Sequence, residues 1–438
     1  MNGLGRLLIA RGIVVTGSDL KRSRGLAMLE QLGATIHVGH RGEQVGRPDA
    51  VVVSSAIPPD NPEVAEARRR GVPVLMRAQV LAALMRGRRG VAVAGTHGKT
   101  TTTSMVSVIL ARVGLTPTFV IGGDLNESGS GAEAGSGDVF VAEADESDGS
   151  FLLLEPDVAV ITNVEEDHLD FYEGREEIES AFAAFAGRAR HVVACWDDPG
   201  TRRSLDGCTV PLVRYGTVQE ADIRIREVRA SGSSAQATIE VGGGAASVRL
   251  GVPGEHNLLN AAAAIGVAHL LGVDPAEAAE ALGTFSGVRR RFERRGAARG
   301  TEFVDDYAHH PTEIAATLRA ARTNGHRLVA VFQPHRYSRT RAMWRSLGES
   351  LGGADLVVVT DVYGAGEQPI PGVTGKLVVE ALLEASPRKR VVYLPRRSDI
   401  APFLAGEVRE GDLVLTLGAG DITMVGEETL DRLRESGA

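Results

Sequence analysis

Short apolar runs alternate along the chain with segments in which apolar residues recur at helical spacing. In the first 113 residues, apolar runs lie at 13–19, 50–59 and 91–94. Helical segments are expected at 22–33, 61–70 and 100–113. Strands that alternate with helices in this way are typical of parallel, doubly wound sheets. The N-terminal part of the chain is therefore predicted to be α/β.

The same alternation returns after the basic stretch GVRRRFERRG at 287–296. Strands separated by helical stretches are expected there at 302–308, 327–334, 355–363, 390–395 and 412–420. Between these two regions, residues 221–252 alternate apolar and polar positions with period two, which predicts further β-structure. The middle region also holds two apolar runs, VFVAEADES and VAVITNVEEDH, that end in acidic or polar residues. Side chains at such strand ends converge on the ligand crevice of an open α/β sheet.

The length of the chain and the changes of pattern predict three α/β domains, because 438 residues are too many for one compact core. We place the domains at 1–88, 89–292 and 293–438. The stretch GRRG at 87–90 is interpreted as a hinge between the first two.

Composition excludes several classes of protein. No apolar stretch approaches the ~18 to 20 residues of a membrane helix, and two cysteines give no disulfide framework. A net charge of -8 does not favour a nucleic-acid partner. The sequence predicts a cytoplasmic protein with no membrane or nucleic-acid partner, and we expect a monomer or a weak homodimer.

A glycine-rich turn, GTHGKT at 95–100, follows the apolar run 91–94 and precedes a predicted helix. The full phosphate-loop pattern would place its first glycine at Val93, so the match is to a shorter G-x-x-G-K-T form. Lys99 is one of only four lysines among 48 basic residues, and a compact ammonium fits between phosphates where a guanidinium is too wide. The alternative is a strand-to-helix turn without a ligand, but the combined context favours phosphate binding, with the Thr100 hydroxyl on a magnesium ion.

Two acidic stretches follow predicted strands. In EADESDGSF at 143–151, four carboxylates within six residues favour a hard cation, and Glu143 is the candidate magnesium ligand. The alternative is a solvated acidic loop. In NVEEDHLDFY at 163–172, His168 stands among acids. Taken alone, such a histidine is more often structural than a metal ligand.

Two further stretches carry candidate binding groups. Asn257 and Asn260 lie one turn apart at the start of an alanine-rich helix and can pair with a base, although His256 or Asn257 can equally cap that helix. Arg336 and Arg339 follow a predicted strand and can bind anions of a second substrate. A basic surface loop is the alternative for these arginines.

Seven motifs in this order resemble the Mur ligase family, and the resemblance extends from GSDLK near the N-terminus to LGAGDI near the C-terminus. The motifs are GTHGKTTT, EADESDGSF, NVEEDHLDFY, GEHNLLNAAAA, GVRRRFE, DDYAHHPTE and FQPHRYSRT. The tails of the last two favour the L-alanine-adding branch of the family. The resemblance implies a Rossmann-like UDP-sugar domain, a central P-loop ATPase-like domain and a C-terminal Rossmann-like domain that closes over them.

The resemblance also implies a reaction. UDP-N-acetylmuramate binds to the first domain and ATP with Mg²⁺ to the second. The muramate carboxylate attacks the γ-phosphate, and the amine of L-alanine then attacks the resulting acyl phosphate. This scheme is an expectation for the present chain.

Site residues follow from the matched motifs. The resemblance implies catalytic roles for Lys99, Glu143 and His168, and metal ligation by Thr100, Glu143 and His168. It implies ATP binding by Gly95, Thr96, His97, Gly98, Lys99, Thr100, Thr101, His256, Asn257, Asn260 and Arg290. It implies substrate binding by Ser18, Asp19, Tyr307, His309, His335, Arg336 and Arg339.

The chain departs from the family pattern at two places. Residues 169–190 contain no lysine, so the carbamoylated lysine of several family members is absent, in agreement with the L-alanine-adding branch. The opening MNGLGRLLIARG resembles the end of a glycine-rich loop and its helix, so the first domain is expected to lack its first strand. The alternatives to an L-alanine ligase are a murein-peptide ligase acting on the same sugar nucleotide, or a chain that binds nucleotide without turnover.

Overall fold

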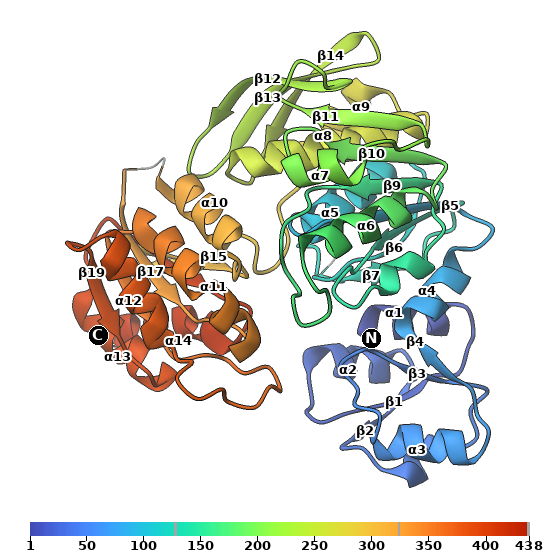
Figure 1. Ribbon diagram of the computed structural model, residues 1–438, viewed down its shortest axis with the longest axis horizontal. Coiled ribbons are helices and arrows are strands. Elements are labelled where there is room, and N and C mark those ends of the chain that lie inside the picture. The colour runs from blue at the N-terminus through green and yellow to red at the C-terminus, as the bar shows by residue number, and fades with distance from the viewer. Residues whose placement is uncertain (127–128, 323–324, 436–438) are drawn as a thin grey trace.

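The structure is a computed structural model that describes residues 1–126, 129–322 and 325–435. Its strands form one ten-stranded sheet, one six-stranded sheet and two two-stranded sheets. Figure 1 shows them as three units in chain order, which we call the N-terminal, central and C-terminal units. The alternation of strands and helices expected from the sequence is confirmed, and the fold is α/β.

The N-terminal unit contains two short parallel strand pairs, β1 with β2 and β3 with β4, which are separate sheets among the described residues. Its elements are α1 (Asn2–Ala10), β1 (Thr16–Asp19), α2 (Arg24–Gln31), β2 (Thr35–Val38), β3 (Val51–Val53), α3 (Pro62–Arg69), β4 (Val74–Met76) and α4 (Arg77–Met85). Strand β3 is much shorter than the run expected at 50–59, since the chain turns after Val53, where the Ile57 backbone N–H donates to the Ser54 carbonyl at 3.0 Å. Leu4 and Leu7 of α1 are buried in a core shared with the central unit.

The central unit is built on the ten-stranded sheet, in the order β14-β13-β12-β11-β10-β9-β5-β8-β6-β7. Its strands are β5 (Arg89–Ala94), β6 (Thr118–Val120), β7 (Ala132–Glu133), β8 (Val139–Glu143), β9 (Val158–Ile161), β10 (His191–Cys195), β11 (Leu212–Gly216), β12 (Ile223–Ala230), β13 (Ala235–Val241) and β14 (Gly244–Leu250). Its helices are α5 (Lys99–Arg112), α6 (Arg175–Ala186), α7 (Pro199–Ser204), α8 (Glu255–Leu270) and α9 (Pro275–Leu282). The period-two pattern at 221–252 is confirmed as the antiparallel strands β12 to β14.

Strand β5 lies between β8 and β9, parallel to both, so it is buried on two faces. Val91 and Val93 face the core that contains α5 and α8, and Ala92 and Ala94 face the core that contains α6. Helix α5 is itself buried along most of its length, although four threonines follow its first residue. Hydroxyls such as those of Thr103 and Ser107 donate to carbonyls four residues earlier, so these buried groups keep hydrogen-bond partners.

The C-terminal unit is built on the six-stranded sheet, in the order β15-β16-β20-β17-β18-β19. Its elements are β15 (Glu293–Ala298), β16 (Thr301–Asp306), α10 (Pro311–Arg322), β17 (Arg327–Phe332), α11 (Tyr337–Ser350), β18 (Leu356–Val359), α12 (Gly375–Ala385), β19 (Arg390–Tyr393), α13 (Ile400–Glu407), β20 (Asp412–Leu417) and α14 (Met424–Glu435). All five strands expected here are present, and they pair in parallel with buried cores on both faces. Strand β15 is additional and antiparallel.

The described helices include none that is long and apolar enough to cross a membrane.

Candidate functional site

A cleft of about 1160 Å³ separates the central and C-terminal units, and loops from both units line it. The central unit contributes the turns that follow β5, β8 and β9, and the C-terminal unit contributes those that follow β16 and β17. A second cavity of about 480 Å³ lies between the N-terminal and central units. Both cavities are lined by Ser55 of the N-terminal unit and by Gly122, Gly123, Asp124, Glu143, Asp145 and Asp148 of the central unit, so they meet at these residues.

The glycine-rich turn between β5 and α5 lies in this cleft and is held from the end of β9. The backbone N–H of His97 donates to Asn163 Oδ1 at 2.8 Å, and Thr162 Oγ1 donates to the His97 carbonyl at 2.5 Å. Gly95 has a φ of 136°, and a Cβ there would lie 3.0 Å from the Thr162 backbone N. Only glycine fits this close approach, which is the geometry that a phosphate-binding turn needs.

Lys99, the first residue of α5, turns its side chain back over the loop. Its Nζ donates to the carbonyls of Gly95 and Thr96 at 2.6 and 3.3 Å, and to Glu146 Oε1 at 2.7 Å. Burial lowers the pKa of Lys99, but the carboxylates of Glu146, Glu143 and Asp145 together raise it above its usual value, so the ammonium stays charged. The cation is therefore held at the mouth of the turn by a carboxylate.

The predicted metal ligands occupy two neighbouring places rather than one. Thr100 Oγ1 donates to Glu143 Oε1 at 3.1 Å, and the Gly122 backbone N–H donates to Glu143 Oε2 at 2.6 Å. His168 Nε2 instead lies 3.7 Å from both Glu146 Oε1 and Asp167 Oδ2. All three predicted ligands line the cleft. Among the described residues, Thr100 and Glu143 are hydrogen-bonded to each other, whereas His168 is hydrogen-bonded to neither.

The amides predicted to bind the base are buried beside the phosphate loop. Asn257 Nδ2 donates to the Pro253 carbonyl at 2.6 Å, and Asn260 Nδ2 donates to Asn257 Oδ1 at 3.3 Å. Asn260 Oδ1 accepts from Thr102 Oγ1 and lies 2.6 Å from the position that a Cβ on Gly98 would take. In this structure both amides support the turn from α8, and their contact with a base stays a prediction. His256 is exposed, and Thr101 is buried within α5.

Arg290 belongs to the C-terminal side of the cleft. Its guanidinium donates to Asp305 Oδ2 at 3.1 Å and to the carbonyls of Gly418, Ala419 and Gly420. Its Cζ lies 5.0 Å from the centre of the Tyr307 ring, within cation–π range. These four bonds use four of the five N–H groups of the guanidinium, so one N–H on Nη1 is left for the predicted contact with nucleotide phosphates.

The other residues of the C-terminal unit that are predicted to bind substrate are three neighbouring aromatic rings and two arginines. The rings of Tyr307 and His309 are 5.2 Å apart, and those of His309 and His335 are 5.7 Å apart. His335 Nδ1 is buried and has no hydrogen-bond partner among the described residues. Burial and neighbouring arginines lower the pKa of His335 to about 4, so this ring is neutral.

Both arginines of this region form ion pairs across the cleft. Arg339 holds both oxygens of Asp167, at 2.9 and 3.0 Å from Nη2. Burial raises the pKa of Asp167, but the Arg339 guanidinium, together with His168 and His310, lowers it further, so the pKa lies well below its usual range. Arg336 donates to Asp170 Oδ2 at 2.8 Å and to Glu367 Oε1 at 2.6 Å. The pairs with Asp167 and Asp170 connect the loop after β9 to the start of α11, and a substrate carboxylate would have to share or displace them.

Ser18 and Asp19, expected to bind substrate, lie at the end of β1 away from both cavities. Ser18 Oγ donates to Glu63 Oε2 at 2.5 Å and lies 2.9 Å from His40 Nδ1. Asp19 Oδ1 accepts from the Lys21 backbone N–H at 3.2 Å. Their role in substrate binding stays a prediction.

Sequence reasoning missed several groups that organise the site. Glu146, which holds Lys99, lies inside the acidic stretch from which the prediction names only Glu143. Asn163 and Asp167 lie in the stretch from which it names only His168. The sequence shows that polar residues follow each strand. It does not show which of these side chains points into the cleft, because that depends on the path of the backbone after the strand.

Three family descriptions match most of the chain. They are "Mur ligase family, catalytic domain" over residues 1–89, "Mur ligase middle domain" over 93–268 and "Mur ligase, glutamate ligase domain" over 290–420. The family expected from the seven motifs is confirmed.

Relatives over the whole length agree with this assignment. The chain is 50% identical to a UDP-N-acetylmuramate–L-alanine ligase of Rubrobacter xylanophilus, over 99% of this chain and 97% of that protein. It is 47% identical to the ligase of the same name from Pelotomaculum thermopropionicum, over 100% and 96%. Among solved structures, a UDP-N-acetylmuramate-alanine ligase of Thermotoga maritima matches with a TM-score of 0.84 and 31% identity, over 99% and 98%. A murein peptide ligase of Psychrobacter arcticus matches with a TM-score of 0.74 and 26% identity, over 99% and 96%. The chain therefore belongs to the Mur ligase family.

Proposed function

We propose that this chain is an ATP-dependent ligase that joins L-alanine to the carboxylate of UDP-N-acetylmuramate in peptidoglycan precursor synthesis. The observation that carries the proposal is the cleft in which Lys99 and its turn face Arg336 and Arg339. A phosphate-binding turn on one wall and carboxylate-binding groups on the other are what ligation of an acid to an amino acid requires. Relatives named as L-alanine ligases, at about half identity over the full length, support the choice of substrates.

We further propose that ATP binds with Mg²⁺ held by Thr100 and Glu143. A hydroxyl and a carboxylate in contact form the oxygen donor set that Mg²⁺ prefers, so the residues fit this ion. When bound, the ion supplies charge neutralisation at the phosphates. His168 is close enough to Glu146 and Asp167 to join a second ion at the same wall.

In the proposed reaction, the residues of the chain mainly position groups and neutralise charge. The ammonium of Lys99 exchanges its loop carbonyls for phosphate oxygens and stabilises negative charge on the transferring phosphoryl group. The muramate carboxylate attacks the γ-phosphorus of ATP, the bond to the β,γ-bridging oxygen breaks, and ADP leaves with an acyl phosphate formed. Arg336 and Arg339 orient the carboxylate of L-alanine so that its amine attacks the acyl carbon, and phosphate leaves.

The cavity between the N-terminal and central units is the proposed entry for the sugar nucleotide. Arg6 and Arg77 are among its lining residues and can meet a diphosphate, and the cavity ends at Glu143, where the cleft begins. A muramate carboxylate that enters from this side would approach a nucleotide held on the phosphate loop.

Phosphate release tests the proposal. The purified chain is incubated with ATP, Mg²⁺ and UDP-N-acetylmuramate, and with either L-alanine or the tripeptide substrate of a murein-peptide ligase. Release of phosphate with L-alanine supports the proposal. Turnover with the tripeptide alone would favour the murein-peptide ligase, and ATP binding without release under either condition would favour a non-catalytic nucleotide-binding protein.

A further inference from the structure

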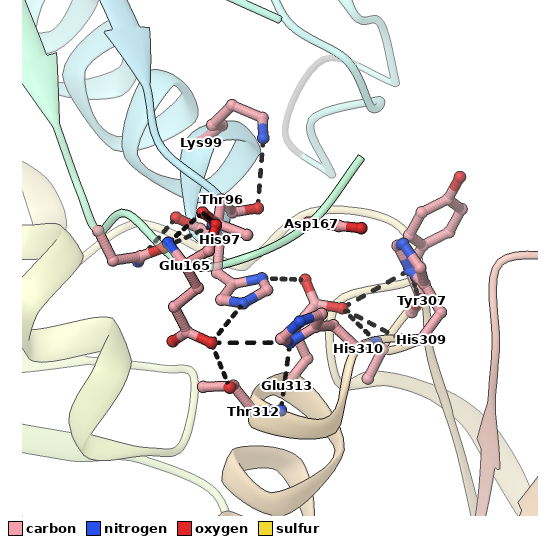
Figure 2. Close-up of polar contacts among 12 residues, drawn as sticks. Thr96, His97, Lys99, Glu165, Asp167, Tyr307, His309, His310, Thr312 and Glu313 are labelled. Carbon is pink, nitrogen blue, oxygen red and sulfur yellow. Dashed lines mark hydrogen bonds and ion pairs between the residues drawn. The ribbon is translucent and has the colours of Figure 1, made fainter. Parts of the chain in front are cut away.

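A second group of possible metal ligands lies where the phosphate loop meets the C-terminal unit. It consists of His97 in the loop, Glu165 after β9 and His310 before α10, and Figure 2 shows the three side chains converging. His97 Nε2 lies 3.6 Å from Glu165 Oε2, and His310 Nδ1 lies 3.8 Å from the same oxygen. All three ligand atoms are within 4.8 Å of one another. None of the three belongs to the set proposed to hold Mg²⁺.

The hydrogen bonds around His97 prepare one of its nitrogens to accept a cation. His97 Nδ1 lies 3.2 Å from Glu313 Oε1, which favours the tautomer with the proton on Nδ1 (Figure 2). That tautomer is the one a metal-bound ring would have. Without a metal, burial lowers the pKa of His97 but the Glu313 and Glu165 carboxylates together raise it to about 9, so Nε2 carries a proton toward Glu165 Oε2. Nε2 is buried and has no hydrogen-bond partner among the described residues. A metal ion at this place would displace the Nε2 proton and lie between Nε2 and Glu165 Oε2, which are 3.6 Å apart.

The surrounding groups resemble the outer shell of a histidine metal site. A carboxylate behind a ligating histidine, here Glu313 behind His97, orients the ring and makes the other nitrogen more basic. Thr312 Oγ1 donates to Glu165 Oε2 at 2.6 Å and orients that carboxylate. The Thr312 backbone N–H also donates to His310 Nδ1 at 3.4 Å, a long bond that metal ligation would replace.

The donor set selects the kind of ion. Two imidazoles and one carboxylate suit Zn²⁺ and similar transition metals, whereas Mg²⁺ prefers oxygen alone. Ligand atoms of a tetrahedral zinc site lie about 3.4 Å apart, given bonds of about 2.0 to 2.1 Å. The separations of Glu165 Oε2 from His97 Nε2 and from His310 Nδ1 exceed this by a few tenths of an ångström. The ligand atoms of the two histidines are within 4.8 Å of each other, so closing the site around an ion requires side-chain rotations that bring all three atoms together.

We propose that His97, Glu165 and His310 form a binding site for Zn²⁺ or a transition metal of the same class, with Glu313 as its supporting carboxylate. His97 and Glu165 belong to the central unit and His310 to the C-terminal unit, so a bound ion connects the two units across the cleft. His97 also lies between Thr96 and Gly98 of the phosphate loop. The ion therefore holds the cleft closed beside the nucleotide and slows any step that needs it to open. The metal site does not depend on the proposed ligase activity.

Metal binding to the full chain tests the site without a catalytic assay. Apo protein is titrated with Co²⁺, and the visible absorption of the bound ion is followed; Zn²⁺ is then added as a competitor. We expect one ion per chain at this site and displacement of Co²⁺ by Zn²⁺. His310→Gln and Glu165→Gln are each expected to weaken binding at least tenfold, and Glu313→Gln about 10- to 100-fold.

His191→Gln is the matched control, because His191 is exposed at the start of β10 and lies outside the cluster. It should bind Co²⁺ as the parent does. The thermal midpoint of each apo variant is measured to show that it folds. Glu165→Gln is expected to disturb folding less than His310→Gln, because the Glu165 side chain is 31% exposed. Parent-like binding by a folded Glu165→Gln or His310→Gln variant, or no saturable binding by the parent, would overturn the proposal.

Discussion

Gly95→Ala tests whether the phosphate loop has the close packing described above. A methyl group at this position would lie far inside van der Waals contact with Thr162 Oγ1, and 3.0 and 3.1 Å from the backbone nitrogens of Thr162 and Asn163. The φ of 136° is also one that residues other than glycine rarely adopt. The backbone nitrogens cannot move without disturbing β9, so the loop or the Thr162 side chain must shift.

The cost can be worked from these contacts. Holding alanine at a strained φ costs about 1 to 3 kcal/mol. Rotation of Thr162 away from the methyl group breaks its hydrogen bond to the His97 carbonyl, at about 0.5 to 1.5 kcal/mol. The total is about 1.5 to 4.5 kcal/mol. If the loop must regain its shape to bind phosphate, nucleotide affinity falls by about 10- to 2,000-fold.

The assay is calorimetric titration with a non-hydrolysable ATP analogue in the presence of Mg²⁺, together with urea unfolding. Gly114→Ala is the control, because Gly114 has a φ of 83° but nothing within 4 Å of the position that a methyl group would take. It should lose about 1 kcal/mol of stability and keep its affinity for the nucleotide. Affinity of Gly95→Ala within about threefold of the parent would refute this account of the loop.

Three further predictions concern single groups. Burial raises the pKa of Cys195 to about 12, so its reactive thiolate is scarce at lower pH. At about pH 8, iodoacetamide should label only Cys208 in the folded chain and both cysteines after unfolding. Labelling of both cysteines in the folded chain would contradict this. Arg339→Lys removes the ability to bind a carboxylate in a bidentate way, so it should raise the KM for L-alanine at least tenfold and leave the KM for ATP unchanged. An unchanged KM for L-alanine would contradict the role proposed for Arg339. Glu143→Gln should raise the Mg²⁺ concentration that gives half-maximal activity about tenfold, and a parental Mg²⁺ profile would remove Glu143 from the metal site.

The sequence predicted the buried parallel strands well, because apolar runs such as 91–94 and 327–332 are stable in a sheet only where both of its faces are covered. Strand β15 was not predicted. Its residues, ERRGAA at 293–298, are largely polar or small and at least partly exposed, and the strand is defined by pairing with β16 at the sheet edge. Backbone pairing of this kind leaves little trace in the side-chain pattern. The domain boundaries at 1–88, 89–292 and 293–438 stay a prediction.

The candidate site was predictable as a set of loops but not as a set of contacts. The motifs placed Lys99, Thr100 and Glu143 on neighbouring turns, and the structure brings the last two into hydrogen-bond distance. The partner of Lys99 was not predictable, because Glu146 lies in the turn after β8 whereas Lys99 follows the turn after β5. The ion pairs of Arg336 and Arg339 with central-unit aspartates depend on how the two units dock, which no local pattern specifies.

The central claim is that Lys99 neutralises a transferring phosphoryl group, and Lys99→Met tests it most directly. Phosphate release with ATP, Mg²⁺, UDP-N-acetylmuramate and L-alanine is compared between the parent, Lys99→Met and Lys376→Met, whose lysine is exposed on α12. Because Lys99→Met leaves the buried Glu146 without its cation, the double variant with Glu146→Gln shows whether folding is the cause of any loss. We predict at least a ~100-fold loss in both Lys99 variants and none in Lys376→Met. Release at the parental rate by Lys99→Met would contradict the account.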